Sequence, residues 1–398
     1  MLKLLVTSNR MVKIDLVKKI PWLIVTGDFV RTGGMDMANY ALARHLAQSG
    51  YETHLVGHSA AEELVVLPGV HFHRVPKPAN SYLLGAPLLD RCGRRWAREI
   101  ASRGGRVLVN GGNCLGTDLN WVHYVHAAYS PKIRAGWLRP AKTWWEHRKF
   151  LVDERRCLER AKVIIANSQR TKNDLVSLLG LPDQKIRVIY YGVDSSAFQS
   201  QTPEMRYSAR EALGWPQDRL KAIFIGALGD RRKGFDVLFQ AWHRLCADSN
   251  WDVDLVVVGA GAELASWQSR AAGDPILKGR IGFLGFRRDV PRILTAADLL
   301  VAPTRYEAYG LGVHEALCCG LPAIVNQSAG VAERYPAQLA TFLVDDPPSD
   351  SALVNCIRAW RKGRERHTSS VATFSRRLRS RTWEDMSAEI IASALRQD

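Results

Sequence analysis

The chain has 398 residues, a formal net charge of +16 at pH 7 and 46% hydrophobic residues, a size that favours two domains and a composition typical of a globular protein. No run of about 18 apolar residues occurs, which excludes a membrane-spanning helix, and charges interrupt residues 1–20 too early for a secretory signal. The positive charge favours polyanionic partners, but no zinc-finger or RNP-type pattern is present, so we expect no nucleic-acid partner.

Two features of the sequence bear on where the protein works. Seven cysteines are scattered without metal-ligand spacing, which is typical of the reducing cytoplasm. Within 136–150, Trp137, Trp144 and Trp145 alternate with basic residues. This segment suits peripheral binding to an anionic membrane surface at the cytoplasmic face, and it suits equally a helix whose tryptophans pack in the core while its basic face is solvated.

Apolar strand-like runs alternate with helical periods along the chain, which predicts an α/β fold with parallel sheets. In the first half we expect a helix over 35–50 and strands over 21–28, 53–57, 106–112, 120–126, 162–168 and 187–194. In the second half we expect a helix over 234–248 and strands near 221–228, 252–258, 279–286, 298–304 and 321–325. Each half has its own strands and helices, so the sequence predicts two doubly wound Rossmann-like domains that face each other across a cleft.

The polar stretch 195–203 interrupts this pattern and predicts a domain boundary. We therefore expect an N-terminal domain over 1–195, a C-terminal domain over 196–375 and a C-terminal helical segment over 376–398. Ligands of open parallel sheets bind at the carboxyl ends of the strands. The glycine turns that follow the strands are therefore the candidate sites.

The segment EAYGLGVHE (307–315) follows one of these strands. Glu307 falls in the loop and Glu315 in a short helix over 311–319, near whose start the amides of Tyr309, Gly310 and Leu311 lie. Free amides at a helix N-terminus attract anions and hydroxyls, and carboxylates accept hydrogen bonds from hydroxyls. The two glutamates are therefore suited to hold a sugar or ribose diol, the alternative being a helix with a charged face.

Two more glycine turns carry candidate phosphate-binding groups. Arg231, Arg232 and Lys233 directly precede the helix 234–248 and suit a diphosphate, although a solvated basic turn has the same pattern. Gly33 and Gly34 lie between a strand and a helix, where glycine lets backbone amides approach a phosphate.

Two further patterns have a structural alternative. His123 and His126 lie near the end of the strand 120–126 and face opposite sides of it, so only one of them faces the cleft. Asp252 and Asp254 form a D-x-D pattern like that of a metal site. This pattern opens a buried strand, which favours a structural role.

Together, and in this order, these segments resemble the GT-B glycosyltransferases of family 4, also called glycosyl transferases group 1. The resemblance covers nearly the whole chain, and its most specific part is the E-x7-E element over 307–315. It implies retaining transfer of a hexose from a UDP- or GDP-linked donor to an acceptor hydroxyl of a glycan or lipid-linked glycan precursor, with no cofactor and no metal. It also implies that domain 1–195 binds the acceptor, that domain 196–375 binds the nucleotide sugar, and that the segment 376–398 crosses back to the first domain.

The same resemblance assigns roles to individual residues. Glu307 contacts the donor sugar, Glu315 the ribose and Lys233 the diphosphate, while His126 orients the donor sugar. The other donor-binding positions are Gly33, Gly34, Phe286, Tyr309, Gly310 and Leu311. A phosphate-binding arginine that many relatives carry is Ala227 here, so that either Arg231 or Arg232 takes its place or phosphate binding is weaker.

Because a fold does not fix a function, other functions stay open. A nucleotide-sugar epimerase or hydrolase fits the same two-domain scaffold. A catalytically silent subunit that only binds a sugar nucleotide is a further alternative, and Ala227 is the feature that favours it.

Overall fold

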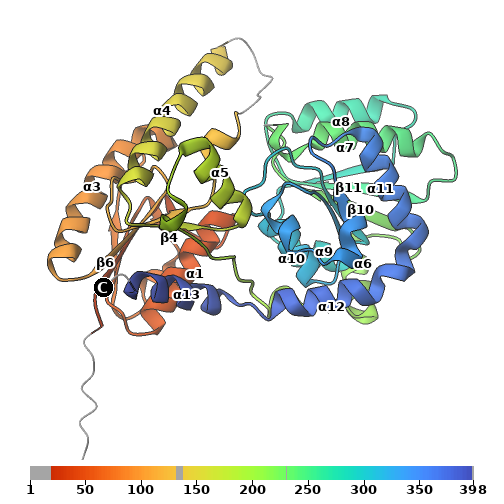
Figure 1. Cartoon of the computed structure of the whole chain (residues 1–398). Coiled ribbons are helices and arrows are strands. Elements are labelled where there is room, and N and C mark those ends of the chain that lie inside the picture. The colour runs from red at the N-terminus through yellow and green to blue at the C-terminus, as the bar shows by residue number, and fades with distance from the viewer. Residues whose placement is uncertain (1–18, 131–137, 230, 397–398) are drawn as a thin grey trace, which may run out of the picture.

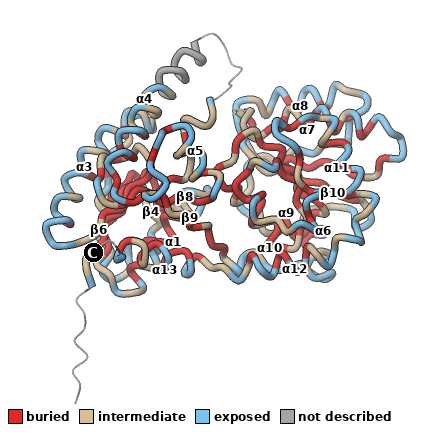
Figure 2. The backbone as a smooth tube through the Cα atoms, viewed as in Figure 1, coloured by how far each residue is buried: buried red, intermediate tan, exposed pale blue. Residues whose placement is uncertain are grey.

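The computed structural model consists of two α/β lobes that lie side by side (Figure 1). The structure describes residues 19–130, 138–229 and 231–396, without the side chains of 138–146. Each lobe contains its own parallel sheet with helices packed on it, and buried residues concentrate in the strands of both sheets (Figure 2). The predicted class, two doubly wound α/β domains, is confirmed.

The N-terminal lobe is built on a seven-stranded sheet whose strand order runs outward from β1 in both directions. In their order across the sheet, the strands are β5 (Val70–Arg74), β3 (Thr53–Gly57), β1 (Trp22–Val25), β6 (Arg106–Asn110), β7 (Leu119–Val122), β8 (Val163–Ala166) and β9 (Ile186–Val188). Two short strands, β2 (Asp28–Phe29) and β4 (Ser59–Ala60), pair beside it. The inner strands are continuous apolar runs because helices cover both faces of a parallel sheet.

The helices of this lobe include one that comes from the far end of the chain. They are α1 (Gly34–Gln48), α2 (Glu62–Val65), α3 (Tyr82–Ser102), α4 (Leu138–Arg160), α5 (Gln169–Leu179) and α13 (Trp383–Leu395), with 3-10 turns η1 (Pro78–Asn80), η2 (His126–Ala128) and η3 (Asp183–Lys185). Helix α13 lies beside α1 (Figure 1), and its Trp383, Met386 and Ile390 belong to the buried cluster of Leu42 and Leu46. The end of the chain therefore completes the N-terminal core.

The C-terminal lobe is built on a six-stranded parallel sheet. In their order across the sheet, the strands are β12 (Ile281–Gly285), β11 (Val253–Val258), β10 (Leu220–Ile225), β13 (Leu299–Ala302), β14 (Ala323–Asn326) and β15 (Leu343–Val344). The helices are α6 (Pro203–Leu213), α7 (Phe235–Cys246), α8 (Leu264–Gly273), α9 (Val290–Ala296), α10 (Leu311–Cys318), α11 (Asp350–Gly363) and α12 (Thr368–Arg379), with 3-10 turns η4 (Arg231–Lys233), η5 (Gly330–Arg334), η6 (Ala337–Phe342) and η7 (Arg364–His367).

Several elements differ from the sequence predictions; the strand predicted over 187–194, for example, ends at Val188. The strand predicted over 120–126 ends at Val122, where the chain turns toward η2. The edge strand β5 was not predicted, because its sequence VHFHR lacks the apolar run of a buried strand. The C-terminal helical segment predicted over 376–398 is not one helix: α12 ends at Arg379, and Thr382 caps the new N-terminus of α13 in a capping box with Asp385.

The predicted domain limits fall at different kinds of places. The limit after residue 195 lies between β9 and α6, where the chain passes from one sheet to the other, whereas the limit after residue 375 lies inside α12. Residues 1–18 and the tryptophan side chains of 136–150 lie outside the described residues, so membrane binding through 136–150 stays a prediction. In the part of the chain that is described, every helix is too short or too polar to span a bilayer.

Candidate active site

The segment between β13 and α10 holds the two predicted glutamates and turns sharply at a glycine. Gly310 has φ +104°, a backbone conformation that side chains rarely adopt. A Cβ atom there would lie 3.0 Å from Val331 Cγ1 and 3.3 Å from Glu307 Cγ. A glycine is therefore required for the loop to fold back and start α10 directly after Glu307.

Glu307 forms the centre of a cationic cluster at the carboxyl ends of β10 and β13. The Nζ of Lys233 lies 2.5 Å from Glu307 Oε2, and the Nη1 of Arg232 lies 3.8 Å from the same oxygen. Burial raises the pKa of the Glu307 carboxyl, but Lys233 and Arg232 outweigh burial and hold it below its usual range. The cluster is therefore an ionised carboxylate with two cations, a set that can exchange partners with an anionic ligand.

A small cavity of about 50 Å³ opens beside this ion pair. It is lined by Lys233, Glu307, the start of α10 from Gly310 to Val313, and apolar residues of the neighbouring strands. A cavity that encloses a whole ligand of nucleotide-sugar size measures roughly 300–1,000 Å³. The space at Lys233 therefore fits only the innermost polar group of such a ligand.

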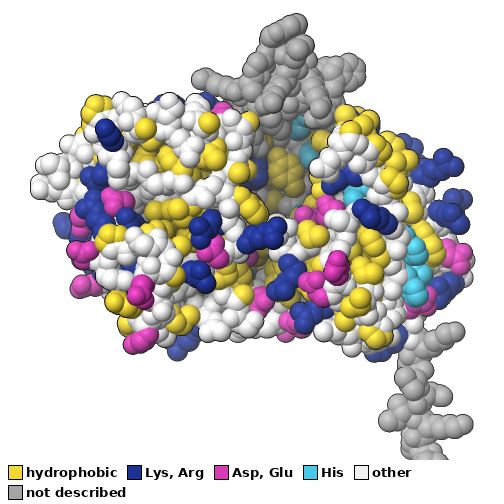
Figure 3. Space-filling view, turned by 180° about the vertical axis from the view of Figure 1, so that it is seen from behind, with side chains coloured by type: hydrophobic (Ala, Val, Ile, Leu, Met, Phe, Trp, Pro, Cys, Tyr) yellow, Lys and Arg dark blue, Asp and Glu magenta, His cyan; other side chains and the backbone are white. Residues whose placement is uncertain are grey.

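The glycine turn of the N-terminal lobe meets this segment from the opposite side. A Cβ atom on Gly34 would lie 3.5 Å from Leu311 Cδ2, so the start of α1 touches the start of α10. Gly33, with φ +89°, is exposed next to this contact. Seen from behind, a recess separates the two lobes, with hydrophobic side chains on its floor (Figure 3). The structure thus brings together two of the glycine turns that the sequence singled out.

His126 lies beyond the end of β7 and not on the strand, so its predicted position is wrong. Its backbone N–H donates to both carboxylate oxygens of Glu154 at 3.0 and 3.1 Å, and its ring stacks on Phe150 at 5.1 Å. Burial, with a smaller effect of His147, lowers the pKa of His126 to about 4. The ring is therefore neutral near pH 7, and the contacts described for it lie within its own lobe.

His123, the other predicted histidine, is connected through aromatic side chains to the segment that holds Glu307 and Glu315. Its Nδ1 hydrogen-bonds the Tyr191 hydroxyl, and burial lowers its pKa to about 3. The Tyr191 and Tyr309 rings pack edge to face with their centroids 5.0 Å apart, and the Tyr309 hydroxyl lies 2.5 Å from His314 Nδ1. A chain of aromatic groups therefore joins the N-terminal sheet to α10.

The backbone around Glu307 is fixed by groups that the sequence did not reveal. The carbonyl of Ala308 accepts hydrogen bonds from Ser168 Oγ at 2.6 Å and Thr171 Oγ1 at 3.2 Å, both on the N-terminal lobe. The Glu307 carbonyl accepts from the Gly330 N–H at 3.0 Å. The segment is thus held from both lobes, and only the common preference for Ser at a helix N-cap marks Ser168 in the sequence.

Two more cross-lobe contacts surround the same segment. The Tyr306 hydroxyl accepts from the Val125 N–H at 3.1 Å. Glu333 accepts from the Gln169 N–H at 2.8 Å and the Arg170 N–H at 3.3 Å, where a carboxylate is favoured at the N-terminus of α5. These residues carry no sequence signal, because their partners lie more than a hundred residues away.

Glu315 has the opposite electrostatic character to Glu307. It lies on α10 and is partly buried, and burial raises its pKa to about 8. Its carboxyl group is therefore largely protonated near pH 7. The two glutamates do not share one charged helix face, because one precedes the helix and the other is inside it.

The remaining predicted residues lie around this core. Arg231 points to Asp236, its Nη1 lying 3.5 Å from Oδ2, whereas Arg232 faces Glu307. Phe286 follows β12 and is 65% exposed, which leaves its ring free to stack on a flat ligand. Ala227 lies in the loop after β10. Of the two candidates for the missing arginine, Arg232 has the better position.

The D-x-D pair is engaged in ion pairs within the C-terminal lobe. Asp252 accepts from Arg361 Nε at 2.8 Å and Nη2 at 2.5 Å. Asp254 lies 2.8 Å from Arg219, 2.9 Å from Lys221 and 3.1 Å from Arg280. Both carboxylates are thus neutralised by side-chain cations, as the structural interpretation of the pattern predicts.

Comparison with known proteins identifies the family. The model for glycosyl transferases group 1 matches residues 219–360, and the model for glycosyltransferase family 4 matches residues 32–197. Together they cover most of both lobes. The chain belongs to the group 1 glycosyltransferases of family 4, and its two lobes form the GT-B fold.

Individual relatives are distant. The D-inositol 3-phosphate glycosyltransferases of Mycobacterium tuberculosis (strain ATCC 25618 / H37Rv) and Mycobacterium bovis (strain BCG / Pasteur 1173P2) are each 27% identical over 336 residues, covering 77% of this chain. The chain spans 66% of the length of these curated relatives.

Solved structures show the same fold at lower identity. Sucrose-phosphate synthase from Thermosynechococcus elongatus superposes with a TM-score of 0.75 and 19% identity over 95% of this chain and 99% of that chain. WaaG, a glycosyltransferase involved in lipopolysaccharide biosynthesis, superposes with a TM-score of 0.72 and 16% identity over 93% of this chain and 98% of that chain. Anabaena HepE in complex with UDP and glucose superposes with a TM-score of 0.68 and 16% identity over 94% of this chain and 99% of that chain.

The raised pKa of Glu315 predicts a specific loss of stability with pH. The carboxyl ionises near 4.5 in the unfolded chain and near 8 in the folded protein, so the folded state holds the extra proton between these values and stability falls as pH rises through them. Glu315→Gln has no proton to lose. We therefore expect its urea midpoint, relative to wild type, to rise steadily from pH 4.5 to pH 8.

The exposed Glu365 offers the control, because Glu365→Gln should follow the wild-type profile. Parallel profiles for Glu315→Gln and wild type would show instead that Glu315 is ionised in the folded protein.

Proposed function

We propose that the protein is a retaining, metal-independent glycosyltransferase that moves a hexose from a nucleoside-diphosphate sugar to an acceptor hydroxyl of a glycan or lipid-linked glycan precursor. The observation that carries this proposal is the Lys233–Glu307 ion pair, at the carboxyl ends of the strands and beside the start of α10. A donor diphosphate competes with Glu307 for the Lys233 ammonium. Once released, the Glu307 carboxylate can accept hydrogen bonds from the sugar hydroxyls.

The relatives support the donor class. Structures of HepE hold UDP-glucose, or UDP and glucose, on the same fold, and the curated relatives are named as glycosyltransferases. The site here offers a base-stacking surface at Phe286, a cation pair at Lys233 and Arg232, and the two glutamates. Phe286 suits the base, the cation pair the diphosphate, Glu315 the ribose and Glu307 the sugar.

Charge stabilisation is the chemical role that the cations supply. When the bond between the sugar and the diphosphate breaks, negative charge develops on the leaving phosphate. Lys233 and Arg232 are preorganised to stabilise it, because their charges already converge on Glu307 Oε2. The acceptor hydroxyl then attacks the oxocarbenium-like sugar from the face that the diphosphate leaves, and the phosphate takes the proton. This sequence retains the anomeric configuration.

The neutral His126 fits a positioning role. With its pKa lowered to about 4, the imidazole is uncharged near pH 7 and is a poor general acid, but its N–H and its other ring nitrogen can form hydrogen bonds with sugar hydroxyls. Hydrogen bonds join the lobes at Ala308 and Tyr306, on both sides of Glu307 in the chain, and closure of the lobes on a bound donor would exclude water from the reacting atoms. Exclusion of water favours transfer over hydrolysis of the donor.

A panel of nucleotide sugars tests the proposal against its alternatives. We expect release of the nucleoside diphosphate from one UDP- or GDP-linked hexose only when a glycan or lipid-linked acceptor is present. Equal release without an acceptor would identify a hydrolase, interconversion of the sugar would identify an epimerase, and binding without turnover would identify a silent subunit.

Variants of the ion pair test the residue roles in the same assay. Lys233→Ala removes the cation nearest the leaving phosphate, and Glu307→Gln keeps the shape of the side chain but removes its charge. We expect each to lower kcat/KM by at least about 100-fold, with an unchanged circular dichroism spectrum. Asp252→Asn is the matched control and should retain wild-type turnover, because that carboxylate pairs with Arg361. Wild-type turnover of Lys233→Ala would contradict its assigned role.

We also propose that the acceptor lies at an anionic membrane surface, because the chain has a net charge of +16 and a basic, tryptophan-rich segment over 136–150. Flotation with liposomes that contain anionic lipid should recover the protein in the lipid fraction at low salt and release it at high salt. Liposomes of neutral lipid are the control. Protein that stays at the bottom of the gradient with anionic liposomes at low salt would contradict membrane binding.

A further inference from the structure

Three histidines and one glutamate gather at the outer edge of the N-terminal sheet. His54 on β3 pairs directly with His71 on the edge strand β5. Because side chains alternate along a strand, His73 lies on the same face as His71, and Glu52 on the same face as His54. Parallel pairing thus places four potential metal ligands on one face of two adjacent strands.

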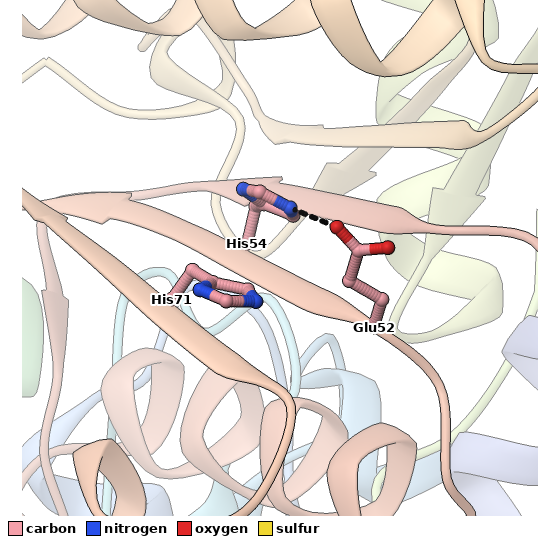
Figure 4. Close-up of side chains that lie close together, drawn as sticks. All are labelled: Glu52, His54 and His71. Atoms are coloured by element: carbon pink, nitrogen blue, oxygen red, sulfur yellow. Dashed lines mark hydrogen bonds and ion pairs between the residues drawn. The ribbon is translucent and has the colours of Figure 1, made fainter.

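Three of these side chains, those of Glu52, His54 and His71, lie close together (Figure 4). His54 Nε2 lies 2.9 Å from Glu52 Oε1, and the rings of His54 and His71 stack with centroids 4.8 Å apart. One ligand atom each from Glu52, His54 and His71 lies within 4.8 Å of the other two. Ligands bound at about 2.0–2.2 Å to one zinc ion lie roughly 3–4 Å apart. A rotation of the exposed His71 ring that shortens these separations would bring all three atoms to bonding distance.

Neighbouring groups hold the side chains of His54 and Glu52 in position. His54 Nδ1 lies 3.0 Å from His73 Nε2, and the His73 ring stacks on Trp96 of α3 at 3.7 Å. Arg103, just after α3, donates to both oxygens of Glu52. A histidine that binds a metal usually has its second ring nitrogen held by a hydrogen bond. His73 supplies that hydrogen bond here.

We propose that Glu52, His54 and His71 bind a zinc ion, with a water molecule as the fourth ligand and His73 as the residue that positions His54. Imidazole and carboxylate are ligands that zinc takes readily. Without metal, the proton on His54 Nε2 donates to Glu52 and His54 Nδ1 accepts from His73. The ion takes the place of that proton, and both rings change tautomer: His54 carries its proton on Nδ1 and donates to His73 Nε2, while the proton of His73 moves through solvent to its Nδ1, so that no proton is gained or lost overall.

The position of the cluster indicates a structural role. Glu52 directly precedes β3, so the cluster lies toward the amino ends of the strands, whereas the Lys233–Glu307 pair lies beyond the carboxyl ends of the other sheet. The ion would join the edge strand β5 to β3, and Glu52 would connect it to the end of α3 through Arg103. The site is therefore independent of the transfer reaction.

The proposal is tested by isothermal titration calorimetry, in which zinc is titrated into the full chain after bound metal has been removed. We expect one equivalent of zinc to bind to wild type. His71→Ala should weaken binding at least about tenfold, and His73→Ala about 10- to 100-fold, the usual effect of removing a group that orients a ligand. His71 is exposed, so its loss leaves the core intact.

His243 is the matched control, because it also lies beside a carboxylate, 3.3 Å from Asp274, and no contact joins it to a second histidine in the described part of the chain. His243→Ala should bind zinc as wild type does. Zinc should also raise the unfolding temperature of wild type and of His243→Ala, but not that of His71→Ala. Absence of stoichiometric binding, or equal binding by wild type and His71→Ala, would overturn the proposal and leave the cluster as a hydrogen-bonded group without a metal.

Discussion

The loop from Tyr306 to Gly310 both contributes to the candidate site and binds the N-terminal lobe. Its side chain at Glu307 belongs to the charged cluster of the candidate site, while its carbonyl at Ala308 accepts hydrogen bonds from Ser168 and Thr171 of the other lobe. The side chain of Tyr309, which is 2% exposed, packs within the core of the N-terminal lobe. Any movement of the lobes relative to each other therefore moves the groups around Glu307. Docking of the lobes and assembly of the site are coupled by the covalent chain.

Electrostatics separates two carboxylates that look equivalent in the sequence. Glu307 stays ionised because Lys233 and Arg232 offset its burial, whereas burial dominates at Glu315 and favours the protonated form. A neutral carboxyl can donate a hydrogen bond as well as accept one. The proposed ribose contact at Glu315 therefore differs chemically from the proposed sugar contact at Glu307, although both residues lie on one short loop and helix.

Local patterns were enough to predict the fold and the loops that meet, because apolar runs and glycine turns are properties of neighbouring residues. The predicted helix over 311–319 agrees closely with α10, and Lys233 and Glu307 come together although 74 positions separate them. The contacts of Tyr306, Ser168 and Glu333 could not be predicted, since they depend on how the lobes pack. The histidine cluster was missed for a similar reason, because the pairing of β3 with β5 creates it.

The most direct test of the account is a crystal structure of the protein with a bound nucleoside diphosphate. We expect the terminal phosphate within hydrogen-bond distance of Lys233 Nζ, with the ribose near Glu315 and the Lys233–Glu307 contact lengthened from 2.5 Å. Such a result would show that the ion pair holds the place of the donor diphosphate. A nucleotide bound elsewhere, with the ion pair intact, would contradict the assignment of the active site.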